Sequence, residues 1–106
     1  MSNYKKFLAE KRRLTILRIL ADVNLSANDF ILHDALRHLG FNTASRDDVR
    51  SDINFMRERL LVEVEILTGL SVSEAVIVVS LTKAGEDVAF GRGDPIEGIA
   101  RPGAGE

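Results

Sequence analysis

The order of hydrophobic patterns between residues 26 and 81 is the feature that most constrains the fold of this chain. Two segments with helical spacing are separated by a short turn, and two apolar, strand-like segments follow them around a polar loop. Apolar residues recur every third or fourth position in a surface helix and every second position in a half-buried strand. The segment is therefore predicted to form a helix, a turn, a second helix and a two-stranded hairpin.

The first of these helices has a start signal and a stop signal. Ser26, three residues before Asp29, resembles a capping box in which the hydroxyl and the acid satisfy free amides of the first turn. Gly40 favours a left-handed residue after the helix, so the helix is expected to end near Leu39. Residues 41–44 then form the turn.

The second helix repeats the start signal with Ser45 and Asp48. It is expected from about Arg46 to Leu60. Four of its apolar residues recur at helical spacing and should face the core, namely Val49, Ile53, Met56 and Leu60.

The two strand-like segments differ in pattern. Glu63 and Glu65 alternate with apolar residues, which is typical of a half-exposed strand, whereas residues 75–79 are continuously apolar. Both faces of that second strand are expected to be covered, by the C-terminal tail or by a second subunit. The hairpin and its loop contain Glu74 as a third acid and no Lys or Arg, so this wing should stay off phosphate groups or face a basic partner surface.

A helix is expected before this segment, over residues 3–22, because four of its apolar side chains share a face: Phe7, Leu14, Leu17 and Ala21. Its second half, residues 14–21, is apolar nearly all round. Such a segment is typical of a helix buried on two sides, so we expect either burial within the monomer under the tail or a homodimer interface.

The pattern changes after the hairpin. Thr82 is predicted to cap a short helix over residues 83–90, and the glycines and prolines that follow predict an extended tail. The predicted fold is α+β and mostly helical. Residues 1–90 would form a winged helix-turn-helix domain with three helices, a two-stranded β wing and a short C-terminal helix, and residues 91–106 the tail.

Composition narrows the class of protein further. A chain of 106 residues with 45% hydrophobic content suits one compact domain. It has no cysteine and no apolar run after Met1, which favours a cytoplasmic protein without a membrane segment. The net charge is only −2, and residues 1–23 are the basic part, with six Lys or Arg against two acids. Any contact with nucleic acid must therefore come from a local patch.

One flank of the second helix carries the candidate DNA-binding residues. In a helix-turn-helix protein this helix enters the major groove, where Arg can donate two hydrogen bonds to guanine. The predicted residues are Arg46, Arg50, Asn54 and Arg57. Asp47 and Glu58 lie beside them and would repel phosphate, so a solvated, salt-bridged surface is the alternative interpretation.

The sequence offers little for catalysis or for a metal. His33 and His38 are five residues apart, about 140° around a helix, so they cannot share an ion. Three aspartates near the start of the second helix, Asp47, Asp48 and Asp52, are interpreted as capping residues and not as a cation site. No phosphate-binding glycine loop or nucleophile motif is present. We expect neither an enzyme nor a cofactor.

Several short motifs carry a family resemblance. LRHLGF at residues 36–41, SRDDVRSDI at 45–53, LTKAG at 81–85 and GIARP at 98–102 resemble a family of small winged-helix proteins encoded in Mu-like phages and prophages. The resemblance covers nearly the whole chain. The family tends to have a glycine before the wing, which residues 59–62 lack. The resemblance implies a phage-derived, DNA-binding-like domain acting in a bacterial host cell.

Two functions are consistent with these observations. The favoured one is a DNA-binding protein, for example a transcriptional regulator. The helix expected from about Arg46 to Leu60 would lie in the major groove, and Lys or Arg side chains of residues 3–22 would lie near the DNA backbone. The alternative is a protein-interaction or phage-assembly module that uses the winged fold to bind a phage protein. A homodimer is expected in either case from the extensive apolar surfaces.

Overall fold

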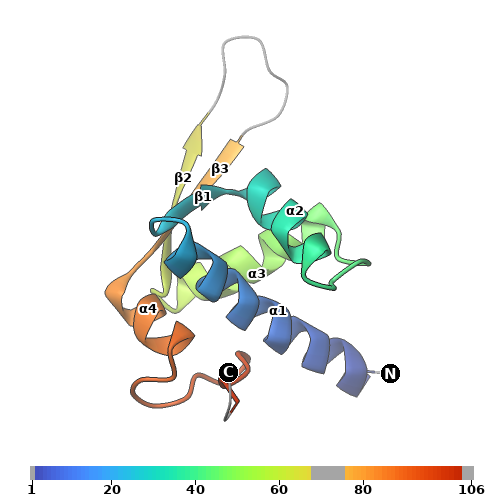
Figure 1. Ribbon diagram of the computed structural model, residues 1–106, viewed down its shortest axis with the longest axis vertical. Coiled ribbons are helices and arrows are strands. Elements are labelled where there is room, and N and C mark those ends of the chain that lie inside the picture. The colour runs from blue at the N-terminus through green and yellow to red at the C-terminus, as the bar shows by residue number, and fades with distance from the viewer. Residues whose placement is uncertain (1, 68–75, 104–106) are drawn as a thin grey trace.

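The computed structural model describes residues 2–67 and 76–103, and within these ranges it contains four helices and one three-stranded antiparallel sheet (Figure 1). The fold is thus α+β. The elements in chain order are α1 (Ser2–Asp22), β1 (Ser26–Asn28), α2 (Asp29–His38), α3 (Arg46–Glu58), β2 (Val62–Leu67), β3 (Val76–Leu81) and α4 (Lys83–Ala89).

The sheet has one strand more than the predicted hairpin. Its order is β1-β3-β2, so β3 is the central strand and pairs with both neighbours. In the added pair Ser26 lies opposite Ser80. The predicted cap at Ser26 is therefore wrong: Ser26 belongs to β1, and Asn28 caps α2 by accepting a hydrogen bond from the amide of Ile31 at 2.8 Å.

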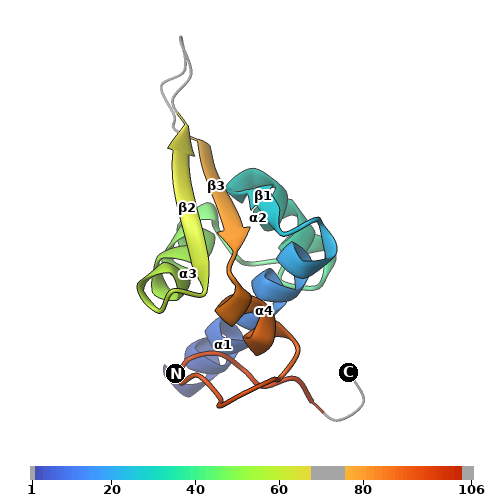
Figure 2. The same cartoon turned by 90° about the vertical axis from the view of Figure 1, so that its left-hand side faces the viewer.

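The helices surround the lower part of the sheet. Figure 2 shows α2 and α3 on the two sides of the sheet, with α1 and α4 below it. The apolar second half of α1 is buried by this packing, and Ile16, Leu17 and Leu20 have no exposed surface. Burial within the monomer thus accounts for the all-round apolarity of this segment. Because Ile16 and Ile19 are buried, they cannot form a dimer surface in this structure.

Strand β3 is less covered than its sequence suggests. Only Val79 is fully buried, and the other five residues of the strand are half-buried. Within one chain the faces of this strand are thus only partly covered, because none of the described helices packs along the upper part of the hairpin (Figure 1). Cover by a second subunit stays a prediction. Ala75 and Glu74, which belonged to the predicted strand and wing loop, lie outside the described residues.

The end of α3 departs from the prediction. Leu60 was expected in the core, but the helix ends at Glu58 and Leu60 is 75% exposed. Leu60 has φ of +64°, a left-handed conformation, which lets the amide of Leu61 reach the carbonyl of Met56 at 3.0 Å. Leu61 is buried in place of Leu60. Leu60 occupies the kind of helix-end position where glycine is favoured.

The C-terminal segment packs against α1. Thr82 caps α4 as predicted, by accepting from the amide of Gly85 at 3.0 Å. Residues 91–103 contain no helix or strand, yet Ile99 is buried in the core and the amide of Ala100 donates to the carbonyl of Glu10 at 3.1 Å. The last three residues of the predicted tail, 104–106, lie outside the described ranges.

Candidate nucleic-acid interface

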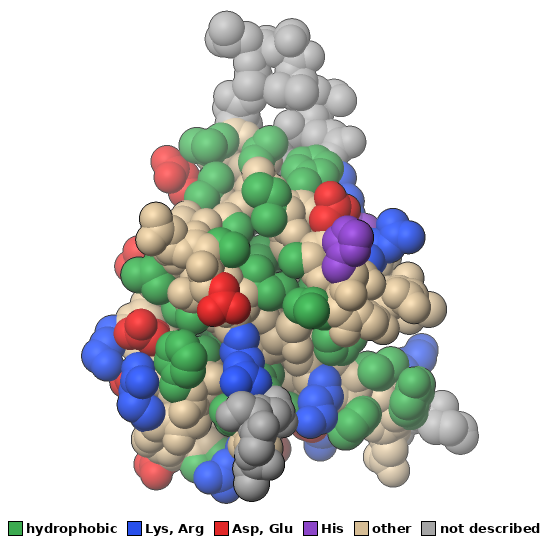
Figure 3. Space-filling view, in the orientation of Figure 1, with side chains coloured by type: hydrophobic (Ala, Val, Ile, Leu, Met, Phe, Trp, Pro, Cys, Tyr) green, Lys and Arg blue, Asp and Glu red, His purple; other side chains and the backbone are tan. Residues whose placement is uncertain are grey.

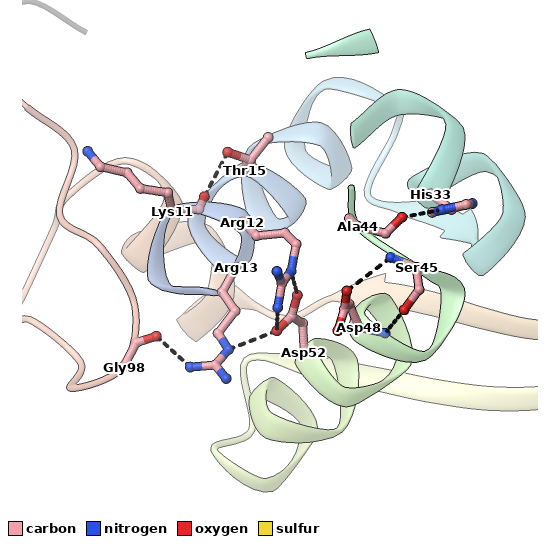
Figure 4. Close-up of polar contacts among 10 residues, drawn as sticks. All are labelled: Lys11, Arg12, Arg13, Thr15, His33, Ala44, Ser45, Asp48, Asp52 and Gly98. Atoms are coloured by element: carbon pink, nitrogen blue, oxygen red, sulfur yellow. Dashed lines mark hydrogen bonds and ion pairs between the residues drawn. The ribbon is translucent and has the colours of Figure 1, made fainter. Parts of the chain in front are cut away.

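Helix α3, the predicted recognition helix, begins as its sequence indicates. The Ser45 hydroxyl accepts from the amide of Asp48, and the Asp48 carboxylate accepts from the amide of Ser45, both at 3.0 Å (Figure 4). The bond from the Ser45 amide holds the pKa of Asp48 below its ordinary value. Val49, Ile53 and Met56 face the core, so the opposite side of the helix is turned outward.

Two of the predicted DNA-binding residues, Arg46 and Arg50, meet at one buried carboxylate. Both donate to Oδ2 of Asp29, the first residue of α2, at 3.2 and 3.0 Å. The guanidinium of Arg46 also stacks on the ring of Phe30 at 3.9 Å. Asp29 has almost no exposed surface, whereas the side chains of Arg46 and Arg50 are 30% and 38% exposed.

Asp29 is ionised in spite of its burial. Burial opposes the charged form, but hydrogen bonds from Arg50 and Arg46, together with the amide of Ile77 at 3.4 Å, outweigh it and lower the pKa of Asp29. One carboxylate therefore joins α2, α3 and β3. Sequence reasoning missed this role because Asp29 was interpreted as part of a helix cap.

The other two predicted residues, Asn54 and Arg57, are exposed on α3. They lie within about 60° of Arg50 around the helix axis, since successive residues are about 100° apart. Asp47 and Glu58 are also exposed on this helix. The structure thus brings the four predicted DNA-binding residues to the same side of α3. Asp47 and Glu58 lie next to them on this outward face, so a cationic flank adjoins an acidic one.

A second buried carboxylate, Asp52, lies on the other side of α3. It accepts from Arg12 through both carboxylate oxygens, and Arg13 donates to it at 3.1 Å (Figure 4). Arg13 also donates to the carbonyl of Gly98 at 2.9 Å and stacks on the ring of Phe55 at 3.9 Å. The interpretation of Asp52 as a capping residue is wrong, because it lies in the middle of α3 and pairs with α1.

The Asp52 cluster has its own electrostatic balance. Burial raises the pKa of Asp52, and the hydrogen bonds and charges of Arg12 and Arg13 oppose this rise. The hydrogen bond to Asp52 raises the pKa of Arg12. Because both arginines are mostly buried in this cluster, they serve the packing of α1 on α3 and not an outer surface.

The remaining polar candidates do not assemble into a reactive site. His33 Nε2 lies 2.7 Å from the carbonyl of Ala44, and His38 is exposed on the same helix. Within residues 2–67 and 76–103, no group of three His, Cys, Asp or Glu side chains is arranged to hold a metal ion. Among the described helices, none combines the length and the hydropathy that a membrane span requires.

The described part of the wing is acidic, as predicted. Glu63 and Glu65 are exposed on β2, which lies at one edge of the sheet. The third acid of the predicted wing, Glu74, lies outside the described residues.

These features define a small α+β protein whose third helix is held on each side by an arginine–aspartate cluster. Over 95 residues the chain is 47% identical to uncharacterized protein gp26 of Escherichia phage Mu. The matched segment covers 90% of this chain and 91% of gp26. The chain therefore belongs to the family of phage Mu gp26.

A second relative is an uncharacterized protein of Haemophilus influenzae, 32% identical over 65 residues that cover 61% of this chain and 63% of the relative. No protein-family model matches the chain, and no solved structure matches it significantly. The resemblance to Mu-like phage proteins is confirmed to this extent, while the winged-helix assignment stays a prediction.

Proposed function

We propose that this protein is a phage- or prophage-derived DNA-binding protein, such as a transcriptional regulator, that places α3 in the major groove. The order of elements supports this: a three-helix unit with a helix-turn-helix is followed by a hairpin, and β1 pairs with β3 beside it. This is the arrangement expected of a winged helix-turn-helix. The protein would act by binding, without catalysis or a cofactor.

The observation that carries the proposal is the Arg46–Asp29–Arg50 cluster beside Asn54 and Arg57. Asp29 and the ring of Phe30 restrict the rotamers of Arg46 and Arg50, yet part of each side chain remains at the surface. A side chain that is already ordered loses less conformational entropy when it binds. The cluster thus presents a pre-organised cationic flank to the groove.

The same structure revises which cations would contact phosphate. Arg12 and Arg13 are held by Asp52, so they are poor candidates, whereas Lys5 and Lys6 of α1 are exposed. Asp47 and Glu58 oppose binding, and because salt also screens this repulsion they should make the salt dependence of the affinity shallower. We therefore expect Lys5 and Lys6 to supply backbone contacts and α3 to supply base contacts.

The test is a fluorescence-anisotropy titration of duplex DNA, from random sequence and from the phage genome, at several salt concentrations. Arg57→Ala and Asn54→Ala should each weaken binding by roughly 1–3 kcal/mol if they contact bases. Arg46→Ala and Arg50→Ala should do the same and relax specificity at one base pair each. Arg101→Ala, which removes an exposed cation of the tail, is the matched control and should change little.

The stability of each variant must be measured beside its affinity, because Arg46 and Arg50 also neutralise Asp29. A loss of binding by Arg57→Ala and Asn54→Ala with unchanged unfolding would support the proposal. The absence of any salt-dependent binding at about 50 mM salt, where phosphate contacts are strong, would contradict it.

The second candidate function is a protein-interaction or phage-assembly module, favoured by the acidic strand β2. Replacing Glu63 and Glu65 by Gln separates the two functions. If the wing lies near DNA phosphates, the double variant should bind DNA more tightly, most clearly at low salt. If the wing contacts a protein, DNA affinity should stay unchanged and the protein complex should weaken.

A further inference from the structure

The first half of α1 presents an aromatic and basic stripe. Tyr4, Phe7 and Lys11 are spaced by three and four residues, so they lie along one face of the helix. Tyr4 is 65% and Phe7 is 51% exposed, and the Lys11 ammonium lies 5.6 Å from the centre of the Phe7 ring. In Figure 3, hydrophobic and basic side chains gather over this end of the molecule, at the lower right.

The outer face of β2 presents an acidic and apolar stripe. Glu63, Glu65 and Leu67 alternate along the strand onto one face, and all three are exposed. The residues opposite Glu65 and Leu67 on β3 are Val78 and Val76, both half-buried. Figure 2 shows β2 at the near side of the sheet, where none of the described helices lies in front of it.

We propose that the stripe Tyr4–Phe7–Lys11 of one chain docks on the stripe Glu63–Glu65–Leu67 of a second copy. The charges are complementary, since a lysine faces two glutamates, and aromatic rings would cover exposed leucine and valine. The lengths also agree. The seven residue steps from Tyr4 to Lys11 along a helix span about 10.5 Å, and the four steps from Glu63 to Leu67 along a strand span about 13 Å.

The geometry requires two molecules. The first half of α1 and the outer part of β2 lie at opposite ends of the protein, so the stripes cannot meet within one chain (Figure 1). If a two-fold axis relates the copies, two equivalent contacts close a dimer; otherwise head-to-tail contacts continue into an open chain. The contact uses no residue of the proposed α3 surface, so its failure and the failure of DNA binding are distinguishable.

The experiment measures mass by light scattering and sedimentation at rising concentrations of the full chain. We expect a concentration-dependent mass above that of the monomer. Lys11→Glu and Glu65→Lys should each weaken self-association by roughly tenfold or more, because each places like charges across the contact. Lys6→Glu, which makes the same charge change on another face of α1, is the matched control and should have a much smaller effect.

Mixing the two reversed variants gives the sharpest result. In the mixture, the natural α1 of the Glu65→Lys chain meets the natural β2 of the Lys11→Glu chain. The two altered stripes also meet with opposite charges, so both contacts between unlike chains are attractive. We expect the mixture to associate although neither variant does so alone, with circular dichroism showing that both are folded. A monomeric natural chain, unaffected association in both variants, or a mixture that stays monomeric would each overturn the proposal.

Discussion

The two buried aspartates, Asp29 and Asp52, use the same partners in different surroundings. Each binds two arginines, but the arginines of Asp29 are about one-third exposed, whereas those of Asp52 are 14% and 16% exposed. Asp29 also accepts a hydrogen bond from a backbone amide of β3, that of Ile77. Burial raises the pKa of each carboxylate, but only at Asp29 do the hydrogen bonds outweigh it, so the pKa of Asp29 lies below its ordinary value and the pKa of Asp52 above it. Two arginine partners alone do not decide how a buried acid titrates, because the burial of the carboxylate itself acts against them.

This difference distinguishes a cluster that only holds the fold together from one that also reaches the surface. The Asp52 cluster joins α1, α3 and the C-terminal segment in a largely enclosed place. In the Asp29 cluster the carboxylate is buried and the guanidiniums are partly exposed. Its arginines can therefore bind Asp29 and also contact a ligand at the surface. Four changes test this contrast.

Asp52→Asn should have the largest effect. It leaves two mostly buried guanidiniums without a counter-charge, and removing one partner of a buried ion pair typically costs about 3–5 kcal/mol of unfolding free energy. Urea denaturation followed by circular dichroism measures the loss. Asp47→Asn removes an exposed acid from the same helix and should cost less than about 0.5 kcal/mol. Equal losses in the two variants would contradict an enclosed role for Asp52.

Asp29→Asn should destabilise the protein less, by about 1–3 kcal/mol, the range for leaving buried hydrogen-bonding groups unsatisfied. Arg46 and Arg50 can turn to water when the carboxylate is lost, which Arg12 and Arg13 cannot do as easily. The same denaturation experiment compares the two variants. A loss for Asp29→Asn as large as that for Asp52→Asn would remove the contrast.

Gly98→Ala should disturb the outer side of the Asp52 cluster. Gly98 has φ of +93°, and an added Cβ would lie 2.3 Å from Cζ of Phe55. Because the ring can shift, we expect a loss of about 1–2 kcal/mol from backbone strain and altered packing. Gly93 also has positive φ but has open space around it, so Gly93→Ala is a matched control for the contact with Phe55. The two variants should differ in stability, and identical losses would show that only the backbone matters.

The smallest effect is a change in the pH dependence of stability. The lowered pKa of Asp29 stabilises the fold above the ordinary value of about 3.9, and this stabilisation is lost as pH falls through the folded-state pKa. The raised pKa of Asp52 has the opposite sign, because the folded state holds that proton more tightly and acidification favours it. As pH falls below the ordinary carboxyl value of about 3.9, Asp29→Asn should therefore reduce the loss of unfolding free energy. As pH falls toward that value from above, Asp52→Asn should steepen the loss. Slopes that change in the same direction would contradict this assignment.

Local signals predicted much of the fold. Ser45 and Asp48 cap α3 as their spacing indicates, and Thr82 caps α4, because a cap depends on residues three positions apart. Strand β1 was missed because three residues are too few to show a period. Ser26 and Asn28 are both good capping residues, and only the pairing of Ser26 with β3 decides between them.

The candidate site was predicted in part. The helical period places Arg46, Arg50, Asn54 and Arg57 on one flank, and the structure agrees, although their binding to DNA stays a prediction. That Asp29 and Asp52 are buried partners of arginines depends on contacts 17 to 40 residues away in the chain, which no local pattern reports. Leu60 was misplaced for a different reason: its spacing fits the helix, but the helix ends before it.

The bond between Arg13 and the carbonyl of Gly98 joins residues 85 positions apart. During synthesis, α1 therefore precedes its carbonyl partner and the buried Ile99 by about 85 residues. Contacts of such long sequence separation form late, because loop closure must precede them. A nascent chain stalled before residue 98 would therefore leave part of α1 uncovered, and the addition of residues 98–100 would complete the packing around this helix.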